Sequence, residues 1–107
     1  MAQATITLML FAAVVNFAAD LSKLPEHRPA HRAGLMKLRD EGKLALSGPF
    51  GDLKGGLMVF SVESADEVDA ILKADIYTAH GIFESWTIKP WNIVVSNLDT
   101  LKAGIPA

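Results

Sequence analysis

Residues 64–75 read SADEVDAILKAD and hold the clearest local signal of how this chain folds. Ser64 and Glu67 have the spacing of a capping box, in which a hydroxyl and a carboxylate accept hydrogen bonds from backbone N–H groups at a helix start. Apolar residues follow at Val68, Ile71 and Leu72, which is the spacing of one helical face. The stretch therefore predicts a short amphipathic helix that ends near residue 74.

The segments on both sides of this helix have the composition of strands. Residues 57–62, LMVFSV, precede it, and residues 82–95, IFESWTIKPWNIVV, follow a short turn over 75–81. Both are rich in β-branched and aromatic residues, which favour strands. The helix is therefore expected to connect two strands of one sheet.

A similar unit is expected in the first half of the chain. It consists of a strand over residues 4–14, a helix from about 28 to 41 and a second strand over 43–48. Pro29 would lie in the first turn of this helix, where a missing N–H is tolerated. A glycine-rich loop over 49–56 leads to the third strand.

The resulting order, β-α-β-β-α-β, is that of the ferredoxin-like α+β fold, an antiparallel sheet with both helices on one face. We expect a single domain over residues 1–95 and a loosely attached tail over 96–107. Because both helices lie on one face of the sheet in this fold, the opposite face is expected to have no helix over it.

The bare face predicts self-association. The last strand carries apolar residues at both sets of alternating positions, with Ile82, Trp86 and Ile88 in one set and Phe83 and Trp91 in the other. A bare apolar sheet face is not stable in water. We therefore predict a homodimer in which two sheets pack face to face.

Composition and charge exclude several classes of function. The chain has 107 residues, of which 50% are hydrophobic, a net charge of −2 and no cysteine. Disulfides, thiolate metal sites and cysteine nucleophiles are thereby excluded, and the charge argues against a nucleic-acid partner. The apolar run over 4–19 has no basic residue and is interrupted by Thr5, Thr7 and Asn16, so a buried strand is favoured over a membrane span or secretory signal. We expect a cytoplasmic protein without a membrane partner.

Two ionisable residues fall on helical faces that should be buried. His31 lies four residues before Leu35 on the apolar stripe of the first helix, and Asp75 is the next position in phase with Ile71 and Leu72. Both helices pack on the same sheet face in this architecture, and a buried carboxylate needs a partner. His31 and Asp75 are therefore expected to be neighbours.

A His–Asp pair has more than one interpretation. The carboxylate can orient one imidazole tautomer and stabilise the imidazolium, which leaves the second nitrogen for general acid–base catalysis. Alternatively the pair is structural and only ties two helices together. A metal site is a third interpretation, because His27 and His31 are four residues apart and His80 would add a third nitrogen. Pro29 between the first two argues against a metal, and we expect no metal and no other cofactor.

Five segments together resemble the YCII-like proteins, namely RPAHRAGL (28–35), EGKLALSGPF (41–50), GGLMVF (55–60), SADEVDAILKADIYTAHG (64–81) and IKPW (88–91). The resemblance spans about residues 8–91 and rests on the ordered set R-P-x-H, S-G-P and A-D-x-Y. It implies a dimeric α+β barrel and an acid–base dyad at the positions of His31 and Asp75. One activity known in the family is removal of HCl from a chlorinated, hydroxylated aromatic ring.

Four further residues are candidates for substrate binding. The resemblance places Ser47 and Pro49 at the rim of the pocket, where Ser47 either donates to a substrate oxygen or caps a turn. Arg28 shares the face of His31 and either binds an anionic or phenolate substrate or pairs with Asp75. Tyr77 either lines the pocket with its hydroxyl or serves only in packing.

The chain departs from the family pattern at three places. Ile76 follows the aspartate where the family usually has proline, Lys23 and Leu24 occupy a stretch that often holds an arginine, and Gly56 replaces a serine. We therefore expect the location and acid–base character of the site to carry over, but not the dehydrochlorinase activity as such. The expected function is a lyase- or isomerase-type enzyme acting on a hydroxylated cyclic or aromatic small molecule. The alternative is a non-catalytic dimeric binding or scaffold protein with a degenerate pocket.

Overall fold

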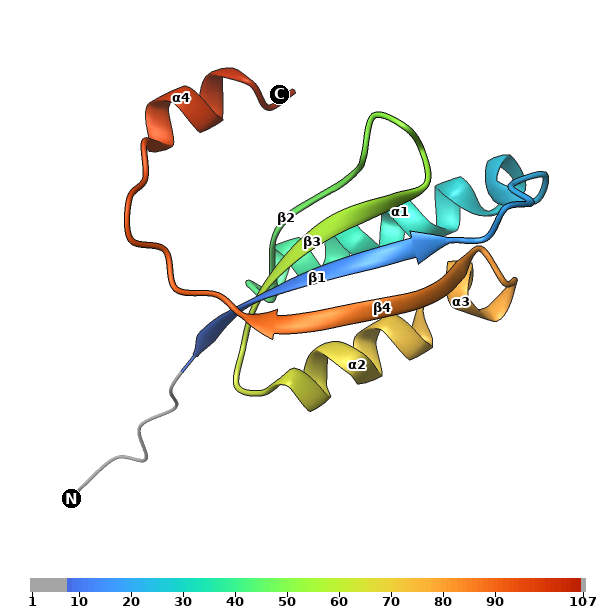
Figure 1. Cartoon of the computed structure of the whole chain (residues 1–107), viewed down its shortest axis with the longest axis horizontal. Coiled ribbons are helices and arrows are strands. Elements are labelled where there is room, and N and C mark those ends of the chain that lie inside the picture. Colours follow the sequence, from blue (N-terminus) through green and yellow to red (C-terminus); the bar gives the residue numbers. More distant parts are fainter. Residues whose placement is uncertain (1–7, 107) are drawn as a thin grey trace.

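A computed structural model describes residues 8–106 (Figure 1). Four strands and two longer helices follow in the expected β-α-β-β-α-β order, with two short helices added. In chain order the elements are β1 (Met9–Phe17), α1 (Leu24–Asp40), β2 (Leu44–Pro49), β3 (Gly55–Val62), α2 (Ala65–Ala74), α3 (Ile76–Ala79), β4 (Phe83–Pro90) and α4 (Leu98–Ala103).

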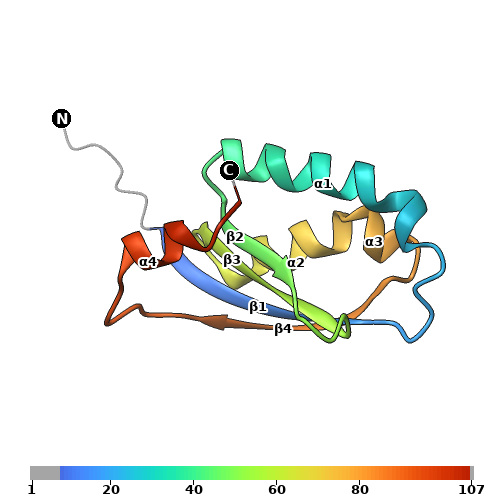
Figure 2. The same cartoon turned by 90° about the horizontal axis from the view of Figure 1, so that it is seen from above.

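The strands form one antiparallel sheet in the order β2-β3-β1-β4. Figure 2 shows α1, α2 and α3 on one face of this sheet, while no helix within residues 8–106 covers the opposite face. The predicted ferredoxin-like α+β fold is therefore confirmed.

Several predicted boundaries were wrong. Of the first strand, residues 4–7 lie outside the described residues, and the strand continues to Phe17. α1 begins at Leu24 with Pro25 in its first turn, so Pro29 lies inside the helix. β4 ends at Pro90 rather than at residue 95, with one further backbone hydrogen bond from the N–H of Trp91 to the carbonyl of Leu10.

The core lies between the sheet and the helices. Alternate residues of β1 point to the helical side, and Phe11, Ala13 and Val15 are almost completely buried. From α2, Val68 and Leu72 pack against them with no exposed surface. These helix positions are those that the apolar spacing predicted.

A bulge changes which residues of β4 face the helices. Val15 of β1 pairs with Trp86, but Phe17 pairs with Phe83 because the register shifts after Asn16. The shift places Phe83 in the same core as Trp86 and Ile88, although simple alternation would separate them. The predicted division of apolar residues between two faces of β4 was therefore wrong.

The side chain of Trp86 ties β4 to α2. Its Nε1 donates to Oδ1 of Asp69 at 2.8 Å, and Lys73 donates to the same carboxylate from the next turn of the helix. The hydrogen bond from Lys73, and then that from Trp86, hold the pKa of Asp69 below its ordinary value.

Candidate functional site

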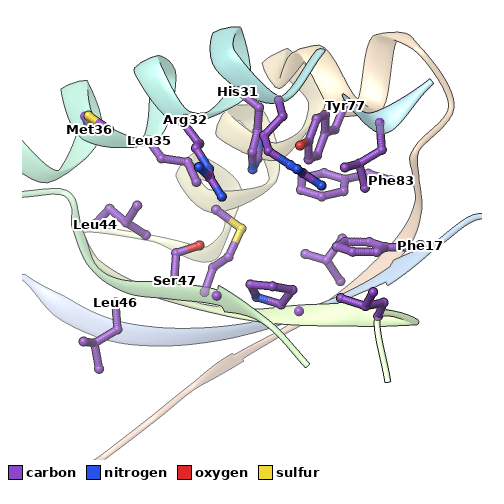
Figure 3. A pocket seen from close by; sticks show the side chains of 18 of the residues that line it. Phe17, His31, Arg32, Leu35, Met36, Leu44, Leu46, Ser47, Tyr77 and Phe83 are labelled. Carbon is purple, nitrogen blue, oxygen red and sulfur yellow. The ribbon is translucent and has the colours of Figure 1, made fainter. Parts of the chain in front are cut away.

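A cavity of about 730 Å³ lies between α1 and the sheet (Figure 3). Its lining comes from β1, α1, β2, β3, α3 and β4 and is mainly apolar. Among the lining residues are His31, Tyr77, Arg28, Ser47 and Pro49. The fold thus brings the predicted substrate-binding residues and His31 to one space.

His31 and Asp75 are in direct contact. The Nδ1 atom of His31 lies 2.8 Å from Oδ1 of Asp75, and both side chains are about nine-tenths buried. The two residues are 44 positions apart, so this contact depends on how α1 packs beside α3. The expected proximity of the two residues is observed.

The reason why Asp75 points to α1 differs from the predicted one. Asp75 is not on the stripe of α2, because it follows the last residue of that helix with an extended backbone, φ −68° and ψ 139°. It is the N-cap of α3, and its Oδ1 also accepts the backbone N–H of Tyr77 at 2.8 Å. A sharp turn between two helices therefore aims the carboxylate at His31.

Aromatic rings fix the plane of the His31 imidazole. Tyr77 stacks on it with ring centroids 3.7 Å apart and an interplanar angle of 10°. Phe83 meets it edge-on at 5.6 Å and 87°. The stack and the edge-on contact together hold the ring in one orientation. Tyr77 packs on the histidine as well as lining the cavity.

The second ring nitrogen of His31 is open to the cavity. Among the described residues, no protein group forms a hydrogen bond with Nε2, whereas every buried side-chain nitrogen and oxygen has a partner. Nε2 is therefore not buried, and His31 lines the cavity. With Asp75 holding Nδ1–H, the neutral ring presents an unprotonated Nε2.

The binding candidates have the following positions. Arg28 lines the cavity and does not pair with Asp75, whose Oδ1 is occupied by His31 and the N–H of Tyr77. Ser47 is on β2, opposite Met58 of β3, and its hydroxyl points into the cavity (Figure 3). Pro49 ends β2 at the rim.

Gly56 completes the floor of the cavity beside Pro49. A Cβ atom at this position would lie 2.8 Å from the carbonyl oxygen of Gly48. The close approach of β2 and β3 therefore leaves no room for a side chain at this position.

Arg32 is among the lining residues that the sequence did not identify as part of the site. Arg32 follows Arg28 by four residues and extends from α1 into the cavity, as Figure 3 shows. The i, i+4 spacing from Arg28 was the signal that could have identified it, since such residues share one helical face.

The three histidines do not converge on a metal position. His27 stacks face to face on His80, with centroids 3.6 Å apart, while His31 is turned to Asp75. Within residues 8–106, no group of three or more histidines and carboxylates is placed to hold a metal ion.

No helix within residues 8–106 is both long and apolar enough to cross a membrane.

Comparison with known proteins gives a consistent family relationship. The profile of the YCII-related domain matches residues 9–92. Protein YciI of Escherichia coli O6:H1 is 33% identical over 97 residues, which cover 80% of this chain and 99% of that protein. Protein YjpA of Bacillus subtilis is 38% identical over 68 residues, covering 64% and 79% of the two chains.

A solved structure shares the fold. It is the 5-chloro-2-hydroxyhydroquinone dehydrochlorinase TftG from Burkholderia phenoliruptrix AC1100, in complex with 2,5-dihydroxybenzoquinone. The TM-score is 0.68 at 24% identity, and the match covers 78% of this chain and 94% of the other. At this identity, the likeness concerns the fold.

Proposed function

The chain belongs to the YCII-related family, and from this premise we propose that it is a small-molecule enzyme in which His31 and Asp75 act as an acid–base dyad. The observation that carries the proposal is that the two ring nitrogens of His31 have different surroundings. Nδ1 is held by Asp75, while Nε2 is open to a mainly apolar cavity. A purely structural histidine would have both nitrogens satisfied.

The proposed chemistry begins with proton transfer to Nε2 of His31. The base takes a proton from a hydroxyl or C–H group of the substrate, and the electron pair of that bond moves into the ring. In an isomerisation the same proton returns to another ring atom. In an elimination a leaving group departs with its bonding pair, and the imidazolium then gives its proton to water.

Asp75 and Tyr77 would support the protonated histidine. The carboxylate of Asp75 lies on the Nδ1 side and offsets the positive charge, and the face of Tyr77 adds a weaker attraction. Arg28 and Ser47 would hold a substrate oxygen, with the guanidinium stabilising an oxyanion as it forms. Pro49 would limit the pocket at the end of β2.

A hydroxylated ring is the substrate type that fits best. Phe17, Tyr77 and Phe83 surround the position of His31 with apolar and aromatic surface. The solved structure of the same fold is a dehydrochlorinase with a dihydroxybenzoquinone bound. These features support a lyase- or isomerase-type reaction on a cyclic or aromatic compound.

The test is a turnover screen with matched variants. Hydroxylated aromatic and alicyclic compounds, halogenated and not, are incubated with the purified protein, and products and released halide are measured. His31→Gln should lower kcat by about 10²-fold or more, and Asp75→Asn should lower it as well. His80→Gln is the control, since that residue does not line the cavity. Equal turnover by His31→Gln and the wild-type protein would refute the proposal.

The tautomer of His31 tests the arrangement that the proposed catalysis requires. Long-range ¹H–¹⁵N spectra should show the neutral ring with its proton on Nδ1 and with Nε2 bare. Binding without turnover of any screened compound would favour the alternative of a binding module or scaffold.

We further propose that the chain is a homodimer. Val14 and Leu57, whose side chains lie on the face without helices, are 40% and 37% exposed. Burying such a patch against a second copy is favourable. Light scattering should give twice the monomer mass, and Val14→Lys should halve it, whereas Ala70→Lys on α2 should not. A monomeric mass for the wild-type protein at micromolar concentration would refute this.

A further inference from the structure

We infer that the substrate is a ring-bearing carboxylic acid and that Arg32 binds its carboxylate. The inference rests on the proposed function, because it concerns the same cavity. It adds a charged group to the substrate at a place separate from the reacting atoms at His31.

The first argument is the direction of Arg32. The residues of α1 that line the cavity recur at intervals of one or three positions and form a single stripe of the helix, Leu24, Pro25, Arg28, His31, Arg32, Leu35, Met36 and Arg39. Arg32 lies one helical turn beyond Arg28 on this stripe. Figure 3 shows its side chain extending from α1 into the cavity rather than away from it.

The second argument is charge. No aspartate or glutamate is among the described residues that line the cavity. Within residues 8–106, neither Arg28 nor Arg32 has a carboxylate within 4 Å, whereas Arg39 is paired with Asp40 at 2.9 Å. Two arginines that lack a carboxylate partner within residues 8–106 therefore border a mainly apolar space. Such a space selects an anion that carries an apolar body.

The third argument is the layout of the cavity, which Figure 3 shows. Aromatic side chains gather around His31 at one end, and the aliphatic Leu35, Met36 and Leu44 lie at the other. Arg32 enters from α1 between these ends, and Ser47 points into the same space from β2. The planar guanidinium of Arg32 can by itself bind both oxygens of one carboxylate, which leaves the hydroxyl of Ser47 for the substrate oxygen that Arg28 also holds.

The size of the cavity agrees with a ligand larger than one ring. A cavity of about 150 Å³ is enough to hold benzene. The cavity here is about 730 Å³, which leaves room for a ring at His31, a carboxylate near Arg32 and an apolar substituent toward Leu44. The planar fork of arginine suits a carboxylate, because both can form two parallel hydrogen bonds.

The test uses two probes of closely similar shape but different charge, 6-hydroxy-2-naphthoate and its neutral amide, 6-hydroxy-2-naphthamide. Binding is measured by their fluorescence and by calorimetry at low salt. The acid should bind the wild-type protein about tenfold or more tightly than the amide, as one charge-assisted hydrogen-bonded pair allows. Arg32→Gln should remove this preference by weakening the acid alone.

The control is Lys37→Gln, which removes the same charge from an exposed position of α1 outside the cavity. It should leave the preference intact, which separates a local contact from the general field of the helix. Circular dichroism checks that each variant remains folded. Arg28→Gln is the comparison within the cavity and should leave most of the preference in place.

Three outcomes would overturn the inference. They are equal affinity of the acid and the amide, no saturable binding of either probe up to millimolar concentration, and a preference that survives Arg32→Gln but is lost in Arg28→Gln. His31→Gln separates this inference from the proposed function. If that variant and the wild-type protein both prefer the acid while neither turns over any screened compound, the carboxylate site stands and the acid–base function fails.

Discussion

Removing the Asp75 side chain tests whether the turn between α2 and α3 is built around this one carboxylate. Its Oδ1 accepts both the backbone N–H of Tyr77 and the Nδ1–H of His31, each at 2.8 Å. Asp75→Ala removes both acceptors at once. Asp75→Asn keeps an amide oxygen in the same place and removes only the charge.

The expected loss follows from these two contacts. Loss of an N-cap costs about 1 kcal/mol of the free energy of unfolding. The Nδ1–H of His31 is then left without a partner in a side chain that is only 11% exposed, which costs about 1–3 kcal/mol more. Asp75→Ala should therefore destabilise the protein by roughly 2–4 kcal/mol. Asp75→Asn should cost about 1 kcal/mol or less, since only the charge assistance is lost.

Urea unfolding at neutral pH, followed by circular dichroism, measures both values. Asp99→Ala on α4 is the control, and it should change the free energy of unfolding by less than about 0.5 kcal/mol because that residue is exposed. The reasoning is refuted if Asp75→Ala costs no more than this control, or if the asparagine variant is as unstable as the alanine variant.

Three further predictions concern the scaffold. Gly56→Ala should lower the free energy of unfolding in urea by about 1–3 kcal/mol, because the new Cβ would meet the carbonyl of Gly48. Gly34→Ala should instead raise it by about 0.5–1 kcal/mol, because nothing lies within 4 Å of a Cβ at that position. Changes of the same sign in both variants would contradict this reasoning. Ser64→Ala should cost about 1 kcal/mol in the same assay through loss of the α2 cap, and no loss relative to the exposed Ser22→Ala would argue against the cap. Because the pKa of Asp69 is lowered in the folded protein, its contribution to stability is present above the ordinary value of 3.8 and is lost as pH falls through the lower folded value. Trp86 fluorescence, measured in a Trp91→Phe background, should show a step below pH 3.8 that Asp69→Asn abolishes. A step with its midpoint above pH 3.8 would refute this prediction.

Local signals in the sequence were sufficient for the element order. The cap of α2 is an example, because Ser64 accepts the N–H of Glu67 at 3.2 Å and the whole signal lies within four residues. The Glu67 side chain in turn accepts the N–H of Glu63, one residue earlier than a standard capping box would place it. Apolar spacing also identified Val68 and Leu72 correctly as core residues. Such signals can be recognised in the sequence because a helix brings together residues only three or four positions apart.

The candidate dyad was found partly for the wrong reason. Helical phase placed His31 correctly toward the sheet, but Asp75 reaches it from a cap between two helices, which phase alone does not reveal. Family resemblance pointed to the same pair through its motifs. The sequence by itself therefore determined which residues to examine, and it determined the ferredoxin-like order that brings both helices to one face.

Only the tertiary structure decided the shape and charge of the cavity. In the sequence, Arg32 resembles any other cation of an amphipathic helix, and only the packing of α1 over the sheet shows that there is a cavity between them that Arg32 lines. The bulge after Asn16, which turns Phe83 into the core, likewise depends on the pairing of β1 with β4. Both features arise from contacts between segments far apart in the chain, and the physical reason is that register and cavities are set by packing rather than by local propensity.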